Sequence, residues 1–314
     1  MSAAVQPAPT PFVPTESQLA MAYSVCRGIA RSAAKNFYYA FIALPRPKSE
    51  AFCAVYAFMR RCDDITDDAS LPVHERRQQL EAWLDAFHRV ASGFATDDPV
   101  LLGLADAQRR YNIPTELLDQ LAYGTETDVE DEDQLLCEAD APILTARCRT
   151  FADLRRYCYG VASVVGLVCI RIFGYRDPAA EPLAERCGLA FQLTNIIRDI
   201  KEDAAMGRIY LPEEDLEKFD VAPAELKTGG DIAKLGLLLQ FEADRAREFY
   251  RFADQLLPLI DEDSQPALWV LVTVYRRLLD RIAERGYDVF SRKVSLSVRE
   301  KSTILLRGLV KRLL

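Results

Sequence analysis

The stretch AVYAFMRRCDDITDD, residues 54–68, joins an apolar helical pattern to four aspartates within six positions. Its apolar residues recur every three or four positions, which is typical of an α-helix that packs in a core. Asp63 and Asp67 are four residues apart, as are Asp64 and Asp68, so each pair shares one face of that helix. Like charges at this spacing destabilise a helix. The aspartates are therefore either tolerated on a solvated face or held together by a bound cation.

The same periodicity continues through most of the 314 residues, whereas no long alternating run indicates a β-sheet. We therefore predict an all-α fold, with a proline-rich disordered arm over 1–16 and a single domain over 17–314. The expected helices span about 17–33, 47–68, 73–92, 98–111, 114–128, 150–173, 180–206, 231–258, 264–288 and 297–312. Gly207 should end the helix before it, and Pro212 should start a further short helix.

The overall charge and the cysteine pattern limit the classes of function. A net charge of −8 and a pI near 5.1 argue against a nucleic-acid-binding surface, which needs an excess of Lys and Arg. The eight cysteines form no CxxC pair, so we expect buried, reduced thiols and a cytoplasmic protein without a signal peptide. With His74 and His88 as its two histidines, both on a polar segment, the chain is not expected to hold a histidine-based triad or zinc site.

Two further segments have unusual compositions. The run VASVVGLVCIRIFG (161–174) is apolar nearly all round and is shorter than the roughly 20 residues that span a bilayer, so it predicts a buried helix. Its small residues are compatible either with plain core packing or with one wall of an apolar cavity. The acidic run over 127–140 is interpreted as a solvated loop without an assigned function.

A second acidic pattern occurs in NIIRDIKED, residues 195–203. Asn195, Asp199 and Asp203 are each four residues apart, so an amide and two carboxylates line one helical face. Mg²⁺ binds through one or two carboxylates while it keeps water and substrate phosphates as its other ligands. One such helix alone is commonly a solvated face, but two that meet inside a bundle could hold several divalent ions beside a phosphorylated substrate.

Four blocks in order resemble the squalene and phytoene synthases, which are head-to-head prenyl transferases: NFYYAFIALP, AVYAFMRRCDDITDD, YCYGVASVVG and FQLTNIIRDIKEDAAMGRIYLP. The similarity covers roughly residues 20–290 and is strongest to bacterial presqualene diphosphate synthases of hopanoid pathways. It implies an isoprenoid-synthase-type helical bundle around a central cavity. It also implies Mg²⁺-dependent joining of two prenyl diphosphates at their C1 ends, by way of a cyclopropylcarbinyl diphosphate.

The resemblance also implies residue roles. Two or three Mg²⁺ ions are expected on Asp63, Asp67, Asn195, Asp199 and Asp203. Catalytic residues near the diphosphates are expected to be Arg60, Arg198, Tyr56, Tyr275 and Tyr157, the last assisting the proton loss after carbon–carbon bond formation. Substrate-binding residues are expected to be Lys35, Phe41, Val161, Ala162, Val165, Gly166, Gln192 and Arg208. Ala34 and Asn36 stand where many members carry hydroxyls, so phosphate contacts there are expected to differ.

The product is predicted from one position. Phe41 falls where a bulky side chain limits cavity depth in the family, which favours two farnesyl diphosphates and presqualene diphosphate, with squalene as its reduced product. The alternative is phytoene from two geranylgeranyl diphosphates. A one-substrate terpene cyclase and a non-catalytic assembly protein are less favoured, because both aspartate sets and the tyrosine helix are present. No GxGxxG follows a strand, yet NADPH use stays open because squalene-forming relatives reduce without that motif.

The tail VREKSTILLRGLVKRLL (298–314) has the pattern of a basic amphipathic helix. It predicts either peripheral contact with the inner face of the membrane or a last helix that packs on the bundle. Contacts with other isoprenoid-pathway enzymes are a further expectation of the family resemblance.

Overall fold

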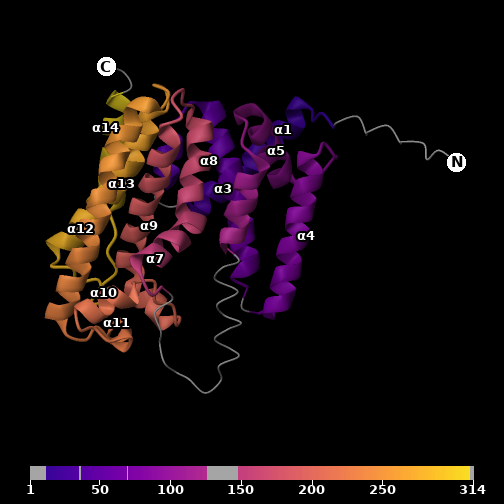
Figure 1. Ribbon diagram of the computed structural model, residues 1–314. Helices are drawn as coiled ribbons and strands as arrows, with labels where there is room; N and C mark the ends of the chain where they lie inside the picture. The colour runs from indigo at the N-terminus through magenta and orange to yellow at the C-terminus, as the bar shows by residue number, and fades with distance from the viewer. Residues whose placement is uncertain (1–11, 35–36, 69, 126–147, 312–314) are drawn as a thin grey trace. The chain divides into compact units, whose positions relative to one another are not determined.

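The computed structural model describes residues 12–34, 37–68, 70–125 and 148–311, which are all-helical apart from turns and one isolated antiparallel bridge between Tyr175 and Ile260 (Figure 1). The labelled elements are α1 Glu16–Ala33, α2 Phe37–Ile42, α3 Arg46–Thr66, α4 Val73–Ala91, α5 Pro99–Tyr111, α7 Phe151–Cys158, the π-helical turn η1 Tyr159–Ser163, α8 Val164–Phe173, α9 Ala180–Ala205, α10 Glu213–Lys218, α11 Pro223–Thr228, α12 Ile232–Leu256, the 3₁₀ turn η2 Leu257–Leu259, α13 Gln265–Glu284 and α14 Val298–Lys311. Residues 115–125 are helical as well. The predicted all-α fold is confirmed.

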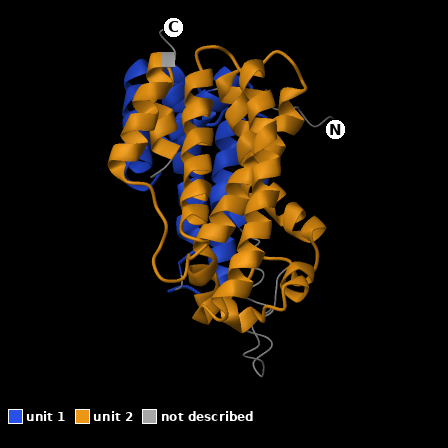
Figure 2. Ribbon diagram, turned by 90° about the vertical axis from the view of Figure 1, so that its left-hand side faces the viewer, with its two compact units in different colours: residues 1–35, 46–133 blue, residues 36–45, 134–314 orange. Residues whose placement is uncertain are grey.

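The chain forms two compact units, shown in different colours in Figure 2. Unit 1 comprises residues 1–35 and 46–133, and unit 2 comprises 36–45 and 134–314. Helix α2 therefore belongs to unit 2, although segments of unit 1 flank it in the sequence. Residues 1–11 lie outside the described part, so the arm predicted over 1–16 stays a prediction.

Unit 1 is built around the packing of α1, α3 and α5 on one another. Thr15 and Gln18 form a capping box at the start of α1, and Asp98 accepts hydrogen bonds from the first backbone N–H groups of α5. At the crossing of these helices a Cβ on Gly103 would lie 3.4 Å from Cys26 Sγ, so small residues allow close approach. Helix α4 packs on α3 through the ring of Phe58, which has no exposed surface.

Unit 2 is organised around α9, which packs against α12, α8, α13 and η1. Two glycines set its distance from the α7–α8 helix. A Cβ on Gly188 would lie 2.6 Å from Ala162 O, and a Cβ on Gly166 would lie 2.7 Å from Ala184 O. Ser163 Oγ adds a hydrogen bond to Glu185 O at 2.9 Å. These contacts require glycine at both positions and fix η1 against α9.

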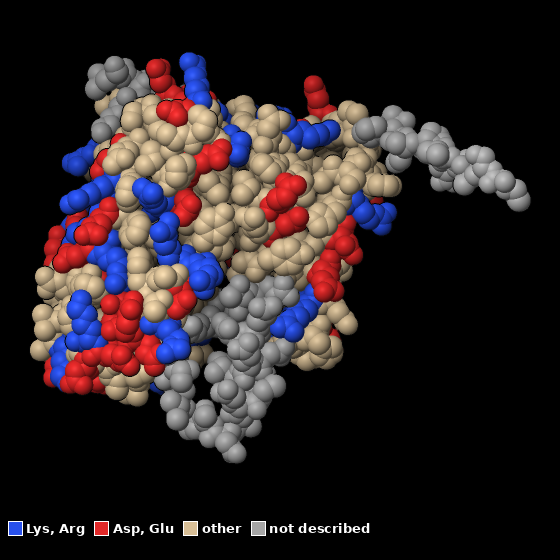
Figure 3. Space-filling model, viewed as in Figure 1, with Lys and Arg blue, Asp and Glu red and all other residues tan. Residues whose placement is uncertain are grey.

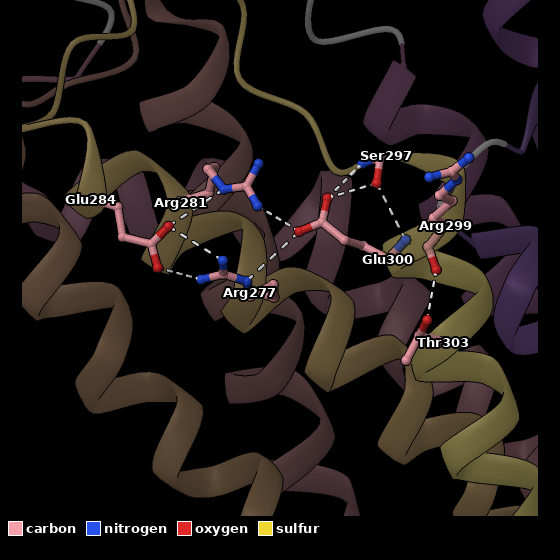
Figure 4. A network of polar contacts seen from close by, with 7 residues as sticks. All are labelled: Arg277, Arg281, Glu284, Ser297, Arg299, Glu300 and Thr303. Atoms are coloured by element: carbon pink, nitrogen blue, oxygen red, sulfur yellow. Dashed lines mark hydrogen bonds and ion pairs between the residues drawn. The ribbon is translucent and has the colours of Figure 1, made fainter.

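The C-terminal helix α14 packs on α13 and α2 within unit 2. Figure 4 shows the polar network that joins α13 to α14, in which Arg281 and Arg277 both reach the Glu300 carboxylate. The other Glu300 oxygen accepts hydrogen bonds from Ser297 N and Oγ, each at 2.9 Å. On the face shown in Figure 3, acidic and basic side chains are interspersed and not gathered in one basic stripe.

Several details differ from the predicted helices. Helix α3 ends at Thr66 and not at residue 68, and α13 ends at Glu284 and not at residue 288. The short helices α2 and α11 were not predicted. The predicted helix over 150–173 is continuous but contains the π-helical turn η1. That helix, Phe151–Phe173, has 23 residues, and by its length and composition it could cross a membrane. The length of 161–174 alone therefore did not exclude a membrane span, and that part of the prediction was wrong. Core helices of bundles meet the same criteria, and this helix packs on α9 through Gly166 and Gly188.

The predicted reduced thiols are confirmed for the described cysteines, all of which are free and most of which are buried: Cys26, Cys53, Cys62, Cys148, Cys158, Cys169 and Cys187. Burial raises the pKa of the Cys53 thiol to about 11, so thiolate chemistry is disfavoured there.

Candidate active site

The first aspartate set lies at the C-terminal end of α3, in unit 1. Asp63 is half-buried in the last turn, whereas Asp67 is exposed just beyond Thr66. Asp67 N still donates to Asp63 O at 2.8 Å, so Asp67 continues the helical turn and keeps the predicted spacing. Carboxylates at a helix C-terminus face the negative end of the helix dipole, which makes this position costly without a cation.

Arg60 and Tyr56 lie one and two turns before these aspartates. Arg60 forms an ion pair with Asp64, and both side chains are nearly half exposed. Tyr56 is half-buried, and burial is the main cause that raises its pKa, with Arg60 opposing the shift. Arg60 is thus available at the surface beside the aspartates that the sequence assigned to a metal.

Sequence reasoning missed the residue that caps this helix end. Arg76, on α4, is 5% exposed, and its Nη1 donates to Thr66 O at 2.8 Å. A buried arginine thereby satisfies a terminal carbonyl of α3 and offsets part of the aspartate charge. The only sequence signal was an arginine in the turn after the break, and surface arginines in helices look the same.

The second set lies on one face of α9, in unit 2, as the spacing predicted. Gln192, Asn195, Asp199 and Asp203 are all half-buried and follow one another along that face. The amide nitrogen of Asn195 donates to Gln192 Oε1 at 3.5 Å, while the buried Asn195 Oδ1 has no hydrogen-bond partner among the described residues. An unpaired buried acceptor is costly and calls for a ligand.

Cations already contact the middle of this face. Arg198 makes two contacts with the Asp199 carboxylate, and Lys293 Nζ lies 3.0 Å from Asp199 Oδ1 and 3.2 Å from Glu202 Oε1. Burial opposes ionisation of Asp199, but Arg198 and then Lys293 hold its pKa below the ordinary value. Asp199 is therefore an anion in this arrangement. Lys293 was missed because it is 94 positions from Asp199 (293 − 199), in a segment without helical periodicity.

Tyr275 closes the apolar side of the same face. It is 2% exposed on α13, stacks on Phe191 with ring centroids 4.5 Å apart, and meets Phe37 of α2 at 5.8 Å. Burial raises the pKa of Tyr275, with Arg198 and a hydrogen bond from Asn195 opposing the shift. The predicted Tyr275 and Asn195 are thus close enough for Asn195 to affect the pKa of Tyr275.

The predicted Tyr157 also contacts the loop GRIYLP, residues 207–212, which follows α9. Gly207, at φ 79°, turns the chain after α9, and Arg208 N donates to Asp203 O at 2.8 Å. The loop then places Tyr210 against Tyr157 of α7 as a parallel stack, with centroids 4.8 Å apart. Pro212 precedes α10 as predicted.

The predicted substrate-binding residues divide into three groups. Val161, Ala162, Val165 and Gly166 are half-buried on η1 and α8, where Gly166 also has the packing role described above. Phe41 is 6% exposed on α2, and Arg208 is half-buried in the loop. Lys35 lies outside the described residues, as does the acidic run over 127–140. Their roles as substrate ligands stay predictions.

The α9 face fits Mg²⁺ by its chemistry. Among the described residues no cluster of three or more His, Cys, Asp or Glu is suited to a metal. Mg²⁺ needs no such cluster, because it takes one or two carboxylates and completes its shell with water and phosphate. The orphaned Asn195 Oδ1 and the ionised Asp199 offer the hard oxygen atoms that this ion prefers.

An all-helical fold whose oxygen-lined helix faces lie beside arginine and lysine is suited to binding diphosphates. The family model of the squalene/phytoene synthases matches residues 30–300. Similar proteins include a phytoene synthase of Mycobacterium tuberculosis, 34% identical over 296 residues that cover 93% of this chain and 92% of that relative. A 15-cis-phytoene synthase of Synechococcus elongatus is 32% identical, with 88% and 89% covered.

Solved structures of squalene and dehydrosqualene synthases are also similar to this chain. A dehydrosqualene synthase in complex with a ligand has a TM-score of 0.80 at 30% identity, with 93% of this chain and 96% of that chain covered. Squalene synthase HpnC from Alicyclobacillus acidocaldarius has a TM-score of 0.74 at 28% identity, with 88% and 97% covered. The chain belongs to the squalene/phytoene synthase family. It is a prenyltransferase of the head-to-head type, and its substrates are prenyl diphosphates.

Proposed function

We propose that this enzyme condenses two farnesyl diphosphates, in an Mg²⁺-dependent reaction, to presqualene diphosphate and pyrophosphate. The observation that carries the metal dependence is the α9 face. There the buried Asn195 Oδ1 has no hydrogen-bond partner among the described residues, and the ionised Asp199 lies one turn further along. When bound there and at Asp63 and Asp67, Mg²⁺ would neutralise the charge that develops on the leaving diphosphate.

The residues of the chain then have separate tasks. The C1–O bond of one substrate breaks and pyrophosphate leaves with the electron pair, while Arg198 and Lys293 counter its charge. The double bond of the second substrate attacks C1, and loss of a C1 proton closes the cyclopropane ring. Tyr157 assists that proton loss, and the apolar side chains of η1 and α8 exclude water from the cation.

The metal-dependent part is tested with two substitutions and a matched control. Asp63→Ala and Asp199→Ala should abolish pyrophosphate release while helical circular dichroism is unchanged. Asp280→Ala, at an exposed position of α13, removes the same carboxylate elsewhere and should turn over normally. Turnover by either of the first two variants would refute the assignment of its aspartate to Mg²⁺. Such turnover would also show that the chain is a catalyst, which refutes the alternative of a non-catalytic assembly protein.

The farnesyl substrate is supported by the buried ring of Phe41. The second candidate, phytoene from geranylgeranyl diphosphate, is supported by the names of the two relatives above. Purified enzyme with Mg²⁺ is given each diphosphate, with and without NADPH, and the products are identified by mass. A C30 diphosphate that accumulates without NADPH supports the proposal, and squalene formed only with NADPH assigns the reduction to this chain. Phytoene with no C30 product would overturn the choice of farnesyl diphosphate.

We also propose peripheral contact of α14 with an anionic membrane surface. Val298, Leu306 and Val310 are exposed by 70%, 63% and 45%, and they lie on one face of the helix at spacings of four or eight. Arg299 and Arg307 are exposed on the same helix. The opposite face, with Ile304 and Gly308, packs on the bundle, so both uses predicted for this helix are compatible.

A further inference from the structure

A buried group of charges in unit 2 joins α10 to α12 and includes no residue of either aspartate set. Arg245 of α12 contacts Asp215 of α10 at 2.8 Å and both oxygens of Glu242 at 2.9 and 3.0 Å. The side chains of Glu242, Asp215 and Arg245 are 1%, 5% and 15% exposed. Two buried carboxylates thus share one guanidinium, and a proton on one of them is needed for neutrality.

The proton belongs to Glu242. Burial is the largest cause that raises the pKa of Glu242 to about 8, while Arg245 opposes the shift and Asp215 adds to it. The groups that face Glu242 are Arg245 on its own helix, Asp215 on α10 and the Cys158 thiol on α7. With the proton on Glu242, one net negative charge faces the guanidinium, and Arg245 keeps its contact with Asp215.

This group ties together the two segments that bring the tyrosines into contact. Arg245 lies over the ring of Phe151, the first residue of α7, at 4.1 Å from its centroid. Phe151 N in turn donates to Glu214 Oε1 of α10 at 2.7 Å. Tyr157 is the residue before Cys158 on α7, and Tyr210 lies five residues before Asp215 on the segment that enters α10.

We propose that Glu242, Arg245 and Asp215 are positioning residues for Tyr157, and that the proton on Glu242 keeps Tyr210 stacked on Tyr157. Loss of that proton leaves two buried anions on one cation, so Asp215 and the α10 segment move away from Arg245 and the tyrosine stack loosens. The inference rests on the role proposed for Tyr157 in the reaction.

The test measures tyrosine geometry and turnover separately. Protein labelled with ¹³C in the tyrosine rings is titrated by NMR across the range around pH 8, and Tyr157→Phe and Tyr210→Phe assign the two signals. In the unsubstituted enzyme both signals should move together as pH rises through about 8. They should not move in that range in Glu242→Gln, which keeps the neutral form of the side chain. Asp215→Asn, a second variant with one carboxylate per guanidinium, should also lose the transition.

Turnover is followed over the same range. The kcat of the unsubstituted enzyme should fall by roughly tenfold, since a small displacement of a reacting group costs at least that order. KM should change less than kcat, because Arg198, Lys293 and the two aspartate sets lie outside α10. Glu248→Gln, an exposed change on the same helix, should behave like the unsubstituted enzyme in both experiments.

The inference is overturned if the Tyr157 signal ignores pH in the unsubstituted enzyme, or if it moves equally in Glu242→Gln. It is supported if the signals behave as expected and kcat follows them. If the signals behave as expected but kcat does not change, the positioning of Tyr157 is supported. That outcome refutes the proposal that Tyr157 assists the proton loss.

Discussion

At the scale of single residues, Gly188 tests how tightly η1 is held against α9. Gly188→Ala places a Cβ 2.6 Å from Ala162 O and 2.9 Å from Ser163 Cα, both of which are backbone atoms that cannot move alone. The free energy of unfolding should fall by about 1–3 kcal/mol, as for other overpacked sites. Urea unfolding followed by circular dichroism measures it.

The matched control is Gly28→Ala in the middle of α1, where a Cβ meets nothing within 4 Å. It should stabilise the protein by about 0.5–1 kcal/mol through helix propensity. Equal effects at the two glycines would contradict the packing role of Gly188.

Glu242 makes stability depend on pH with a defined sign. Its pKa is about 8 in the folded chain, against an ordinary value of 4.5, so between these pH values the folded chain holds a proton that the unfolded chain releases. The free energy of unfolding should therefore fall as pH rises through this window, by up to about 1.4 kcal/mol per unit, and level off above it. Denaturation at several pH values should give a steeper fall for the unsubstituted protein than for Glu242→Gln. Parallel curves would mean that Glu242 is ionised throughout.

The residues that could be grouped from the spacing alone are those joined by a helical period, whereas the tyrosines were assigned by the family resemblance. Asn195, Asp199 and Asp203 share a face because the spacing of four is a local property of the helix. Arg76 and Lys293 were missed because each reaches its partner through tertiary structure, Thr66 in one case and Asp199 in the other. No local pattern distinguishes such cations from solvated ones.

At the scale of elements, most long helices were predicted within a residue or two, as α1, α4 and α9 illustrate, whereas α13 ends four residues before its predicted end. Their length gives the apolar period enough repeats, and caps such as Thr15 mark their ends. The six-residue helices α2 and α11 are too short to show a period. The turn η1 was missed because one inserted residue changes the hydrogen-bond pattern without changing composition.

Helix α14 should bind anionic membranes through its exposed face if the proposal is right. The double change Leu306→Glu and Val310→Glu replaces apolar contacts with charges that the lipid surface repels, so flotation with anionic liposomes should be reduced. Both side chains are exposed, so folding should be unaffected.

A control variant adds two glutamates to another helix of unit 2, α12. Ile232→Glu and Leu237→Glu change side chains that are 76% and 57% exposed near the start of α12, and they should leave flotation unchanged. If both double variants float alike, α14 serves only as a bundle helix.

At the scale of the whole molecule, metal and diphosphate should stabilise the enzyme together. A ligand that binds only the folded chain adds about 2.7 kcal/mol at a hundred times its Kd. Mg²⁺ with pyrophosphate should therefore raise the melting temperature more than the sum of either alone, because each supplies ligands that the other needs. Chelation by EDTA should reverse the shift.

Asp199→Ala should lose this joint stabilisation, whereas Asp280→Ala should keep it. An equal shift in the presence of EDTA would show that pyrophosphate binds through Arg198 and Lys293 without a metal.

The class of fold was predictable from the whole chain because an apolar period of three to four residues persists over many long segments. The grouping into two units was not, because it depends on which helices pack together, and neither loop length nor composition marks residues 36–45 as part of unit 2.

That assignment of α2 affects how the protein is made. Phe37 of α2 contacts Tyr275 of α13, and 238 positions separate them (275 − 37). A ribosome that adds about 5–20 residues per second takes from about ten seconds to nearly a minute to cover this distance. During that time α1 and α3 can already fold together, while the segment between them has no partner. Biosynthesis therefore leaves α2, with its apolar sequence FYYAFI, available to chaperones until the last helices of the chain emerge.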